Sequence, residues 1–80
     1  MNKLIHKFRK NSFEEIQINA NEFKGHQYVD IRIYVGSPDE KTAPTKKGVS
    51  IPIELYIEFS KGISILEDIL EDEQLFDPKY

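Results

Sequence analysis

The hydrophobic pattern of this chain changes its period once, at Pro52, and the change separates two kinds of secondary structure. Before Pro52, apolar and polar residues alternate with period two, which is typical of half-buried strands. After Pro52, apolar residues recur with period 3.6, which is typical of a helix. Because 80 residues provide only one domain, the pattern predicts an α+β fold: an antiparallel sheet followed by one C-terminal helix.

The alternation is clearest in residues 28–35, and it predicts a strand with one apolar face. The opposite face of that strand is amphipathic, because it carries two tyrosines beside Asp30 and Arg32. Residues 13–21 alternate in the same way. Gly25 lies between the two segments and is free to adopt a positive φ, so the two strands are expected to form a long antiparallel hairpin.

Two shorter strands complete the expected sheet. Residues 41–47 predict a short third strand, which Pro44 restricts to an edge or a bulge. Gly48 then redirects the chain into a brief fourth strand at residues 49–51. Residues 1–12 form a basic N-terminal arm, for which the sequence leaves two readings open: a mobile segment or the first edge of a strand.

The helical part carries two apolar stripes, and one helix needs only one stripe to cover a sheet. The second stripe therefore needs another surface, which is most simply the same helix of a second copy. We expect a helix-mediated homodimer whose interface contains Leu55, Phe59, Gly62, Ile63 and Leu66.

Charge is distributed unevenly along the chain, whose formal net charge is −3. Residues 1–53 contain nine Lys/Arg and six Asp/Glu, whereas residues 54–80 contain two and eight. This asymmetry indicates a basic working half and an acidic C-terminal tail, residues 71–80. The tail is read either as a solubilising segment or as a functional one. In the second reading, Leu75, Phe76 and Tyr80 dock transcription or replication proteins, or the tail competes with DNA for the basic groove.

The composition argues against several classes of protein. The chain contains no cysteine, no phosphate-cradling Gly-rich loop and no Ser/His/Asp order, so we expect no enzyme, cofactor or metal site. His6 and His26 are too far apart in sequence to form a local ligand pair. No segment is apolar enough for a signal peptide or a membrane span, which predicts an intracellular protein of the cytoplasm, nucleoid or nucleus.

Three segments at a fixed order and spacing resemble a known family. Phe23-Lys24-Gly25, residues 29–34 and the run from Pro44 to Ile51 resemble the core of the transcriptional coactivator positive cofactor four family. The resemblance extends from about Phe23 to Leu70 and more weakly back to Phe13, so residues 13–70 are expected to form the domain. It implies a β-β-β-β-α fold that dimerises through its helices, with curved sheets that bind single-stranded DNA with little sequence preference.

The resemblance also implies which residues bind DNA. Phe23 matches a stacking aromatic, Arg32 matches the arginine of the second strand, and Val35 stands where the best-known member has a stacking tryptophan. Together with the arm residues, the candidate DNA-binding residues are Phe23, Lys24, His26, Arg32, Tyr34, Lys46, Lys47, Lys7, Arg9 and Lys10.

Each assignment has a structural alternative. Arg32 is otherwise an ion-pair partner of Asp30, and Phe23 is otherwise a core residue. Tyr28 and Tyr34 either assist DNA binding or pack under the helix.

From the resemblance we predict a sequence-nonspecific single-stranded-DNA-binding protein, resembling a coactivator, that acts in transcription, replication or recombination. The alternative is a dimeric protein-interaction adaptor with weak or lost DNA binding. The richness in Ile, Lys, Asn and Glu indicates an AT-rich genome, bacterial or viral.

Overall fold

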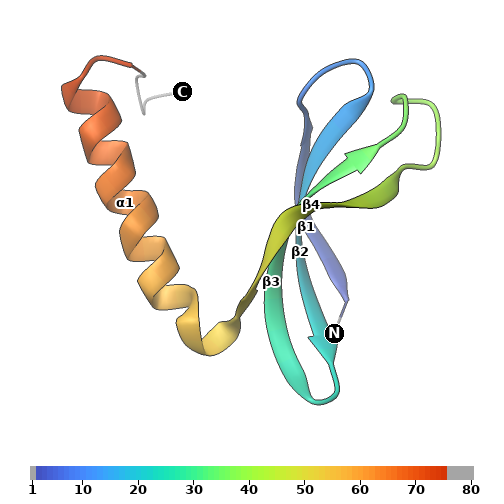
Figure 1. Ribbon diagram of the computed structural model, residues 1–80, viewed down its shortest axis with the longest axis horizontal. Coiled ribbons are helices and arrows are strands. Elements are labelled where there is room, and N and C mark those ends of the chain that lie inside the picture. The colour runs from blue at the N-terminus through green and yellow to red at the C-terminus, as the bar shows by residue number, and fades with distance from the viewer. Residues whose placement is uncertain (1, 76–80) are drawn as a thin grey trace.

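The computed structural model describes residues 2–75 and confirms the α+β class (Figure 1). One antiparallel sheet has the strand order β1-β2-β3-β4. A 3-10 turn, η1, leads from the last strand into a single helix, α1. The elements are β1 (Lys3–Arg9), β2 (Glu14–Phe23), β3 (His26–Val35), β4 (Ala43–Pro52), η1 (Ile53–Leu55) and α1 (Tyr56–Asp72).

The sheet has four strands, as predicted, but two of them were assigned wrongly. The expected third and fourth strands are one continuous strand, β4, and Gly48 lies inside it. The missing strand comes from the N-terminal arm, where the edge-strand reading is the one observed. β1 pairs with β2 from Lys3↔Ala20 to Arg9↔Glu15.

Gly48 does not interrupt β4. Its lack of a side chain allows the backbone of β4 to lie close to Arg32 of β3. It lies opposite Arg32, and a Cβ added to it would be 2.8 Å from both the Cα and the Cβ of Arg32. The register shifts just beyond this point, between Arg32 and Tyr34. A glycine inside a strand often marks such a bulge or a close backbone approach.

β2 and β3 are joined by the two-residue turn Lys24-Gly25. Both residues have positive φ, 52° and 80° respectively, which is the pattern of a type I′ hairpin turn. Gly25 adopts this conformation without penalty, as expected, whereas Lys24 does so against the preference of an L-residue with a side chain. The turn therefore holds Lys24 in a conformation that its own backbone disfavours.

The register of the hairpin divides the sheet into two chemically different faces. Ile16, Ile18 and Ala20 lie opposite Ile33, Ile31 and Val29, and they form what we call the apolar face. The opposite side, which we call the polar face, carries the side chains that alternate with them. On β2 and β3 these are Glu15, Gln17, Asn19, Asn21, Phe23, His26, Tyr28, Asp30, Arg32 and Tyr34.

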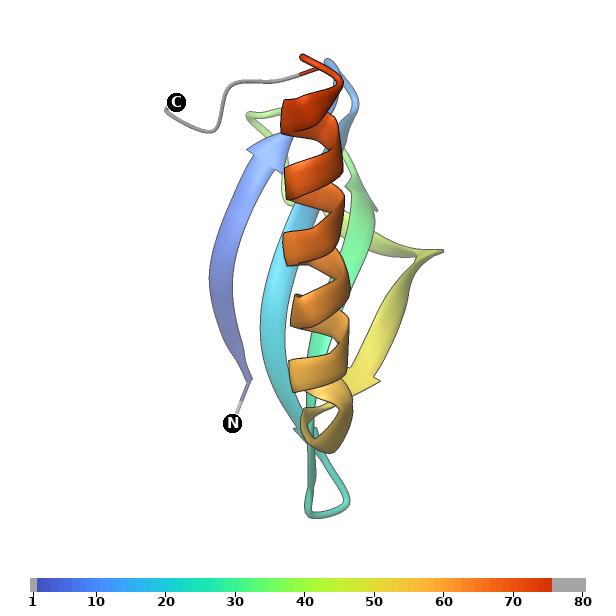
Figure 2. The same cartoon turned by 90° about the vertical axis from the view of Figure 1, so that its left-hand side faces the viewer.

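The helix does not cover the apolar face as one of its stripes was expected to do. α1 leaves the sheet at η1 and stands apart from it in Figure 1, and in Figure 2 it runs along the strands in front of them. No described residue of α1 is buried. Within residues 2–75, Ile51 is the single hydrophobic side chain that is buried, at 7% exposure. The apolar core of the chain is therefore incomplete.

Candidate nucleic-acid interface

The polar face holds more deeply buried side chains than the apolar face. Glu15, Gln17 and Asp30 are 4%, 9% and 5% exposed, whereas the isoleucines of β2 and β3 are only half-buried. The loop of residues 36–42 closes one end of the polar face through Thr42, whose hydroxyl donates a hydrogen bond to Glu15. Carboxylates tolerate such burial only when they are paired and hydrogen-bonded, and both are.

The first of these pairs ties β1 to β2. The Arg9 guanidinium donates to Oε1 of Glu15 at 3.1 Å and to the carbonyl oxygen of Gly36 at 2.7 Å. Gln17 donates to the other carboxylate oxygen of Glu15. The hydrogen bond from Gln17, assisted by Arg9 and by the charge of Lys7, holds the pKa of Glu15 below its ordinary value despite burial. Arg9 therefore has a structural role on the polar face.

The second pair lies within β3, and its hydrogen bonds with Thr45 and Ser50 join β3 to β4. Arg32 donates to both carboxylate oxygens of Asp30, at 2.9 and 3.1 Å, and to the carbonyl oxygen of Thr45 at 3.0 Å. Burial acts to raise the pKa of Asp30, but hydrogen bonds from Arg32 and Ser50 outweigh it and lower that pKa. Hydrogen bonding to Asp30 also raises the pKa of Arg32. The ion-pair alternative for Arg32 is thus present in the structure. A guanidinium has five donors, so two remain for a ligand.

The hairpin turn brings three predicted residues together. The Phe23 ring is 64% exposed, and Nζ of Lys24 lies 5.3 Å from its centroid. His26 pairs with Phe23 across the turn. Exposure excludes the core reading of Phe23 within the chain. An exposed ring beside a cation combines the two contacts that unpaired bases and phosphates accept.

A small hollow adjoins this turn on the polar face. It has a volume of about 290 Å³ and is lined by Asn21, Phe23, Tyr28 and Ser50. Tyr28 lies on this face because it pairs with Asn21, so its predicted alternative position under the helix is wrong. Tyr34 pairs with Glu15 and lies on the polar face as well. Sequence reasoning did not include Asn21 or Ser50 in the site and gave DNA binding as one of two alternatives for Tyr28. The alternation of β2 and β3 places Asn21 and Tyr28 on the same face as Phe23.

The remaining predicted cations are dispersed. Lys7 lies on the polar face opposite Gln17. Lys10 forms an ion pair of 3.8 Å with Glu14 at the turn between β1 and β2. Lys46 is exposed on β4. Lys47 lines a groove with Ile16 and Ile33, on the apolar side of the sheet. The hydrogen bond from Asn11 lowers the pKa of Glu14, and the charges of Lys10 and Lys47 lower it further.

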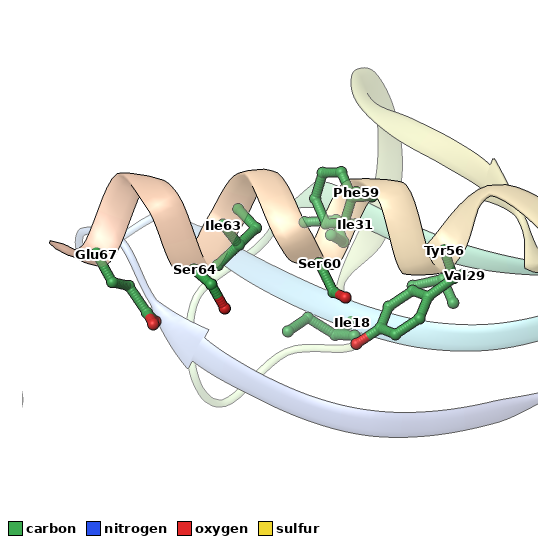
Figure 3. A pocket seen from close by; sticks show the side chains of 9 residues that line it. All are labelled: Ile18, Val29, Ile31, Tyr56, Phe59, Ser60, Ile63, Ser64 and Glu67. Carbon is green, nitrogen blue, oxygen red and sulfur yellow. The ribbon is translucent and has the colours of Figure 1, made fainter. Parts of the chain in front are cut away.

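Four of the five predicted dimer residues lie on one face of α1, and Leu55 lies in η1 just before it. Phe59 and Ile63 line a groove of about 460 Å³ that separates the helix from Ile18, Val29 and Ile31 of the apolar face (Figure 3). Three polar side chains, Ser60, Ser64 and Glu67, lie along the helix at the same groove. Leu55 and Leu66 are 56% and 47% exposed, and a Cβ added to Gly62 would meet no atom of the chain.

Part of the acidic tail lies outside the described residues. Leu75 is described and is 69% exposed, whereas Phe76 and Tyr80 are not described. Within residues 2–75, no three His, Asp or Glu side chains gather as a metal site would require. In the same range, no helix has the length and apolar character needed to cross a membrane.

Comparison with known proteins identifies similar sequences and folds. The family model described as Transcriptional Coactivator p15 (PC4) matches residues 10–62. The crystal structure of a PC4 homologue from Burkholderia pseudomallei is 30% identical, with a TM-score of 0.73, over 82% of this chain and 89% of that chain. Among curated proteins, no sequence gives a significant match.

Two further solved structures share the fold at lower identity. The bacteriophage T5 homologue of the eukaryotic coactivator PC4 has a TM-score of 0.64 at 24% identity, over 92% of this chain and 82% of that chain. The structure of MoSub1 in complex with DNA has a TM-score of 0.62 at 22% identity, over 90% of this chain and 84% of that chain.

Proposed function

The chain belongs to the family of the Transcriptional Coactivator p15 (PC4), and we propose that it binds single-stranded DNA with its polar face and works as a homodimer. We infer a binding protein rather than an enzyme. A DNA partner would place the protein in the DNA-containing compartment of a cell, whether a cell of its own organism or a host cell.

The observation that carries the proposal is the exposed Phe23 ring at a strained turn, with Lys24 above it and the hollow beside it. Base stacking on an aromatic side chain contributes about 1–3 kcal/mol per base and tolerates any sequence. Intact duplex has no free base to stack, so single strands should bind more tightly. The candidate ligand contacts, in addition to Phe23 and Lys24, are His26, Arg32, Tyr34, Lys46, Lys47, Lys7, Arg9 and Lys10.

These contacts are not equivalent. Arg9 and Arg32 are already held by carboxylates, so each offers only part of its guanidinium to a phosphate. Phe23 and Lys24 make no such bonds to the sheet, and we therefore expect them to contribute more affinity than either arginine. DNA reaching Lys47 would have to pass around the edge formed by β4, because that lysine lies on the apolar side.

The homodimer is supported by what the single chain leaves exposed. α1 carries exposed apolar residues on one side and faces an open groove on the other. A second copy could fill the groove and cover Leu55, Phe59, Gly62, Ile63 and Leu66. The same argument applies to Ile16 and Ile33, which line the second groove.

The process that the protein serves is a separate question. The T5 homologue is described as implicated in recombination-dependent DNA replication, and MoSub1 was solved with DNA. At identities below 25% these structures show the fold alone, and we propose that this chain acts in transcription, replication or recombination. We also propose that the acidic tail docks partner proteins through its apolar residues, of which Leu75 is 69% exposed.

The alternative function, a dimeric adaptor, has one specific observation in its favour. Both arginines of the polar face are neutralised by Glu15 and Asp30, so neither offers its full charge to a polyanion. An adaptor would retain the dimer and show no affinity for oligonucleotides.

Fluorescence anisotropy separates the two functions. Labelled oligo-dT and a duplex of matching length are titrated with the protein over a salt series. We expect tighter binding of the single strand, with log K falling by about 0.7 per neutralised phosphate for each unit of log salt concentration. Phe23→Ala should weaken oligo-dT binding by a factor of about ten or more with little change in salt slope. Equal affinity for both DNAs would contradict the stacking model, and no affinity for either would favour the adaptor.

A further inference from the structure

The hollow beside the hairpin turn differs chemically from the rest of the polar face. Its four lining residues, Asn21, Phe23, Tyr28 and Ser50, combine two aromatic rings with two neutral hydrogen-bonding groups. None of them carries a charge. The ionic cluster around Asp30 begins just beyond Ser50, and the cluster around Glu15 lies farther along this face. Its volume of about 290 Å³ lies just below the range of pockets that hold drug-sized ligands, roughly 300–1,000 Å³. These dimensions and linings suit one planar, polar-edged ring system.

Phe23 has one ring face available to such a ligand. The Lys24 ammonium lies 5.3 Å from the ring centroid, a distance at which a cation occupies one face of the ring. A base can then stack on the other face, while Tyr28 provides a second aromatic wall. Lys24 stays close enough to contact the phosphate that accompanies the base.

Ser50 can act only as a hydrogen-bond acceptor toward the hollow. Its hydroxyl donates to Oδ1 of Asp30 at 2.6 Å. Two hydrogen bonds from Arg32 keep Asp30 anionic, and an anionic carboxylate has no proton to donate in return. The single proton of Ser50 is therefore committed, and its oxygen lone pairs are what remain for a ligand. Asn21 offers both a donor and an acceptor, because its amide is not held by another side chain of the described residues.

We propose that this hollow is a subsite for one unpaired nucleobase and that Ser50 makes it favour cytosine and adenine over thymine and guanine. Cytosine and adenine present an exocyclic amino donor at the position where thymine and guanine present a carbonyl oxygen. Because Ser50 can only accept, it can form a hydrogen bond with the amino group of cytosine or adenine. Toward the carbonyl oxygen of thymine or guanine, it would place two acceptors against each other. The inference rests on the proposed DNA binding and adds a base preference at one position of an otherwise sequence-tolerant surface.

The test compares fluorescein-labelled oligo-dC and oligo-dT of equal length by anisotropy at neutral pH. One net hydrogen bond predicts that the wild-type dimer binds oligo-dC roughly three- to tenfold more tightly than oligo-dT. Ser50→Ala should bring the two affinities together, and Ser50→Thr, which keeps the hydroxyl, should preserve the preference. Tyr28→Leu should weaken both oligonucleotides and leave their ratio unchanged, because stacking does not depend on the base edge.

Gln27→Ala is the matched control. Gln27 is exposed on the same hairpin and pairs with Glu22 on the opposite face of the sheet, so its removal should change neither affinity. Equal wild-type affinity for the two oligonucleotides would overturn the base preference and leave the proposed function standing. Retention of the preference in Ser50→Ala would overturn the role of Ser50. Failure to bind either oligonucleotide would overturn both proposals.

Discussion

At the scale of single residues, the cations of the sheet and its hairpin turn are of two kinds. Some are held by hydrogen bonds within the chain, and others are available to a ligand. Arg9 and Arg32 each make three hydrogen bonds within the chain. The ammonium of Lys24 makes no hydrogen bond to another described residue, and its backbone has a φ of 52°, which residues with a side chain disfavour. Residues held in sparsely populated conformations cluster at functional sites, where the strain is retained for a reason other than stability. At Lys24 the loss of folding stability and the contribution to DNA binding can therefore be measured separately.

Replacing Lys24 by Asn should make the protein more stable and bind DNA more weakly. Asn-Gly is the preferred sequence of a type I′ turn, so the melting temperature should rise. Loss of the ammonium should reduce the magnitude of the salt slope for oligo-dT by about 0.7. Thermal denaturation and the anisotropy salt series measure the two effects. A variant that is stabilised but retains the full slope would remove Lys24 from the interface.

Gly48→Ala should destabilise the fold, because the new methyl group would overlap backbone atoms. A Cβ at this position would be 2.6 Å from the carbonyl oxygen of Ile31 and 2.8 Å from the Cα of Arg32. Forcing such overpacking costs about 1–3 kcal/mol of unfolding free energy, which urea denaturation can measure. Lys46→Ala, at an exposed position of the same strand, is the control and should cost little. An unchanged unfolding free energy in Gly48→Ala would mean that β4 can move away from β3 at no cost.

The sequence predicted the positions of those residues whose contacts are made with neighbours along the chain. Period two placed Tyr28, Asp30 and Arg32 on one face, and the Gly25 turn was identified from composition. The partners of Arg9 were beyond prediction, because Gly36 lies 27 residues away in sequence and reaches Arg9 only through the assembled sheet. The same limit hid the hollow, since Ser50 joins it from β4.

At the scale of elements, β1 and α1 were the two difficult assignments. β1 lacks clear alternation and is nonetheless a strand, because its register with β2 and the bond network around Glu15 define it. The irregular step between Leu4 and His6 interrupts its periodicity. α1 was correctly predicted as a helix, but its position relative to the sheet was not. Two apolar stripes indicate that the helix packs against two surfaces, and they do not indicate which of these surfaces belongs to the same chain.

The attachment of β1 should be sensitive to acid. The folded pKa of Glu15 lies below its value of 4.5 in the unfolded chain, so the unfolded state binds protons first as the pH falls. The resulting stability is present above about pH 4.5 and is lost as the pH decreases through the folded pKa. We expect the melting temperature to fall between about pH 5 and pH 3. Glu15→Gln should melt lower at neutral pH and depend less on pH in this window.

Glu71→Gln, in the exposed last turn of α1, is the control for this series and should keep the wild-type pH dependence. Asp30, whose pKa is also lowered, will contribute a second and similar loss that Glu15→Gln leaves in place. If Glu15→Gln and wild type show parallel curves, the Arg9–Glu15 pair does not stabilise the folded chain.

At the scale of the whole molecule, the single chain is too open for a finished domain. Its radius of gyration is 14.7 Å, whereas a compact chain of 80 residues has about 11.6 Å. Its accessible surface is 6514 Å², against roughly 5,000 Å² for a compact monomer of this mass. The excess of about 1,500 Å² is of the order that one partner buries in an obligate dimer.

The folded helix should therefore depend on protein concentration. A 17-residue helix without packing partners is marginally stable in water. We expect the melting temperature to rise with concentration, because the second copy acts as a ligand of the folded state. Circular dichroism at 222 nm should lose helical signal on dilution, and sedimentation equilibrium should give a dimer at micromolar concentration.

Phe59→Glu is the variant that tests this dependence, since it places a charge in the groove between α1 and the sheet. It should be monomeric and should have lost most of its helical signal. Gly62→Ala complements it: the methyl group meets no atom of the chain and should improve helix propensity by about 1 kcal/mol. A weaker dimer in Gly62→Ala would place the glycine at the contact with the second copy, whereas a monomeric, fully helical wild type would contradict the proposed assembly.

The open groove between α1 and the sheet has a consequence for turnover. A chain that has not found its partner exposes isoleucines, Phe59 and a marginal helix, and locally unfolded segments of this kind are what proteases cleave. Pairing would hide the same surfaces and lengthen the lifetime of both copies. Newly made chains at low concentration would be degraded before they met a second copy. The protein would therefore accumulate only above a threshold rate of synthesis, and the chains that survive would be paired.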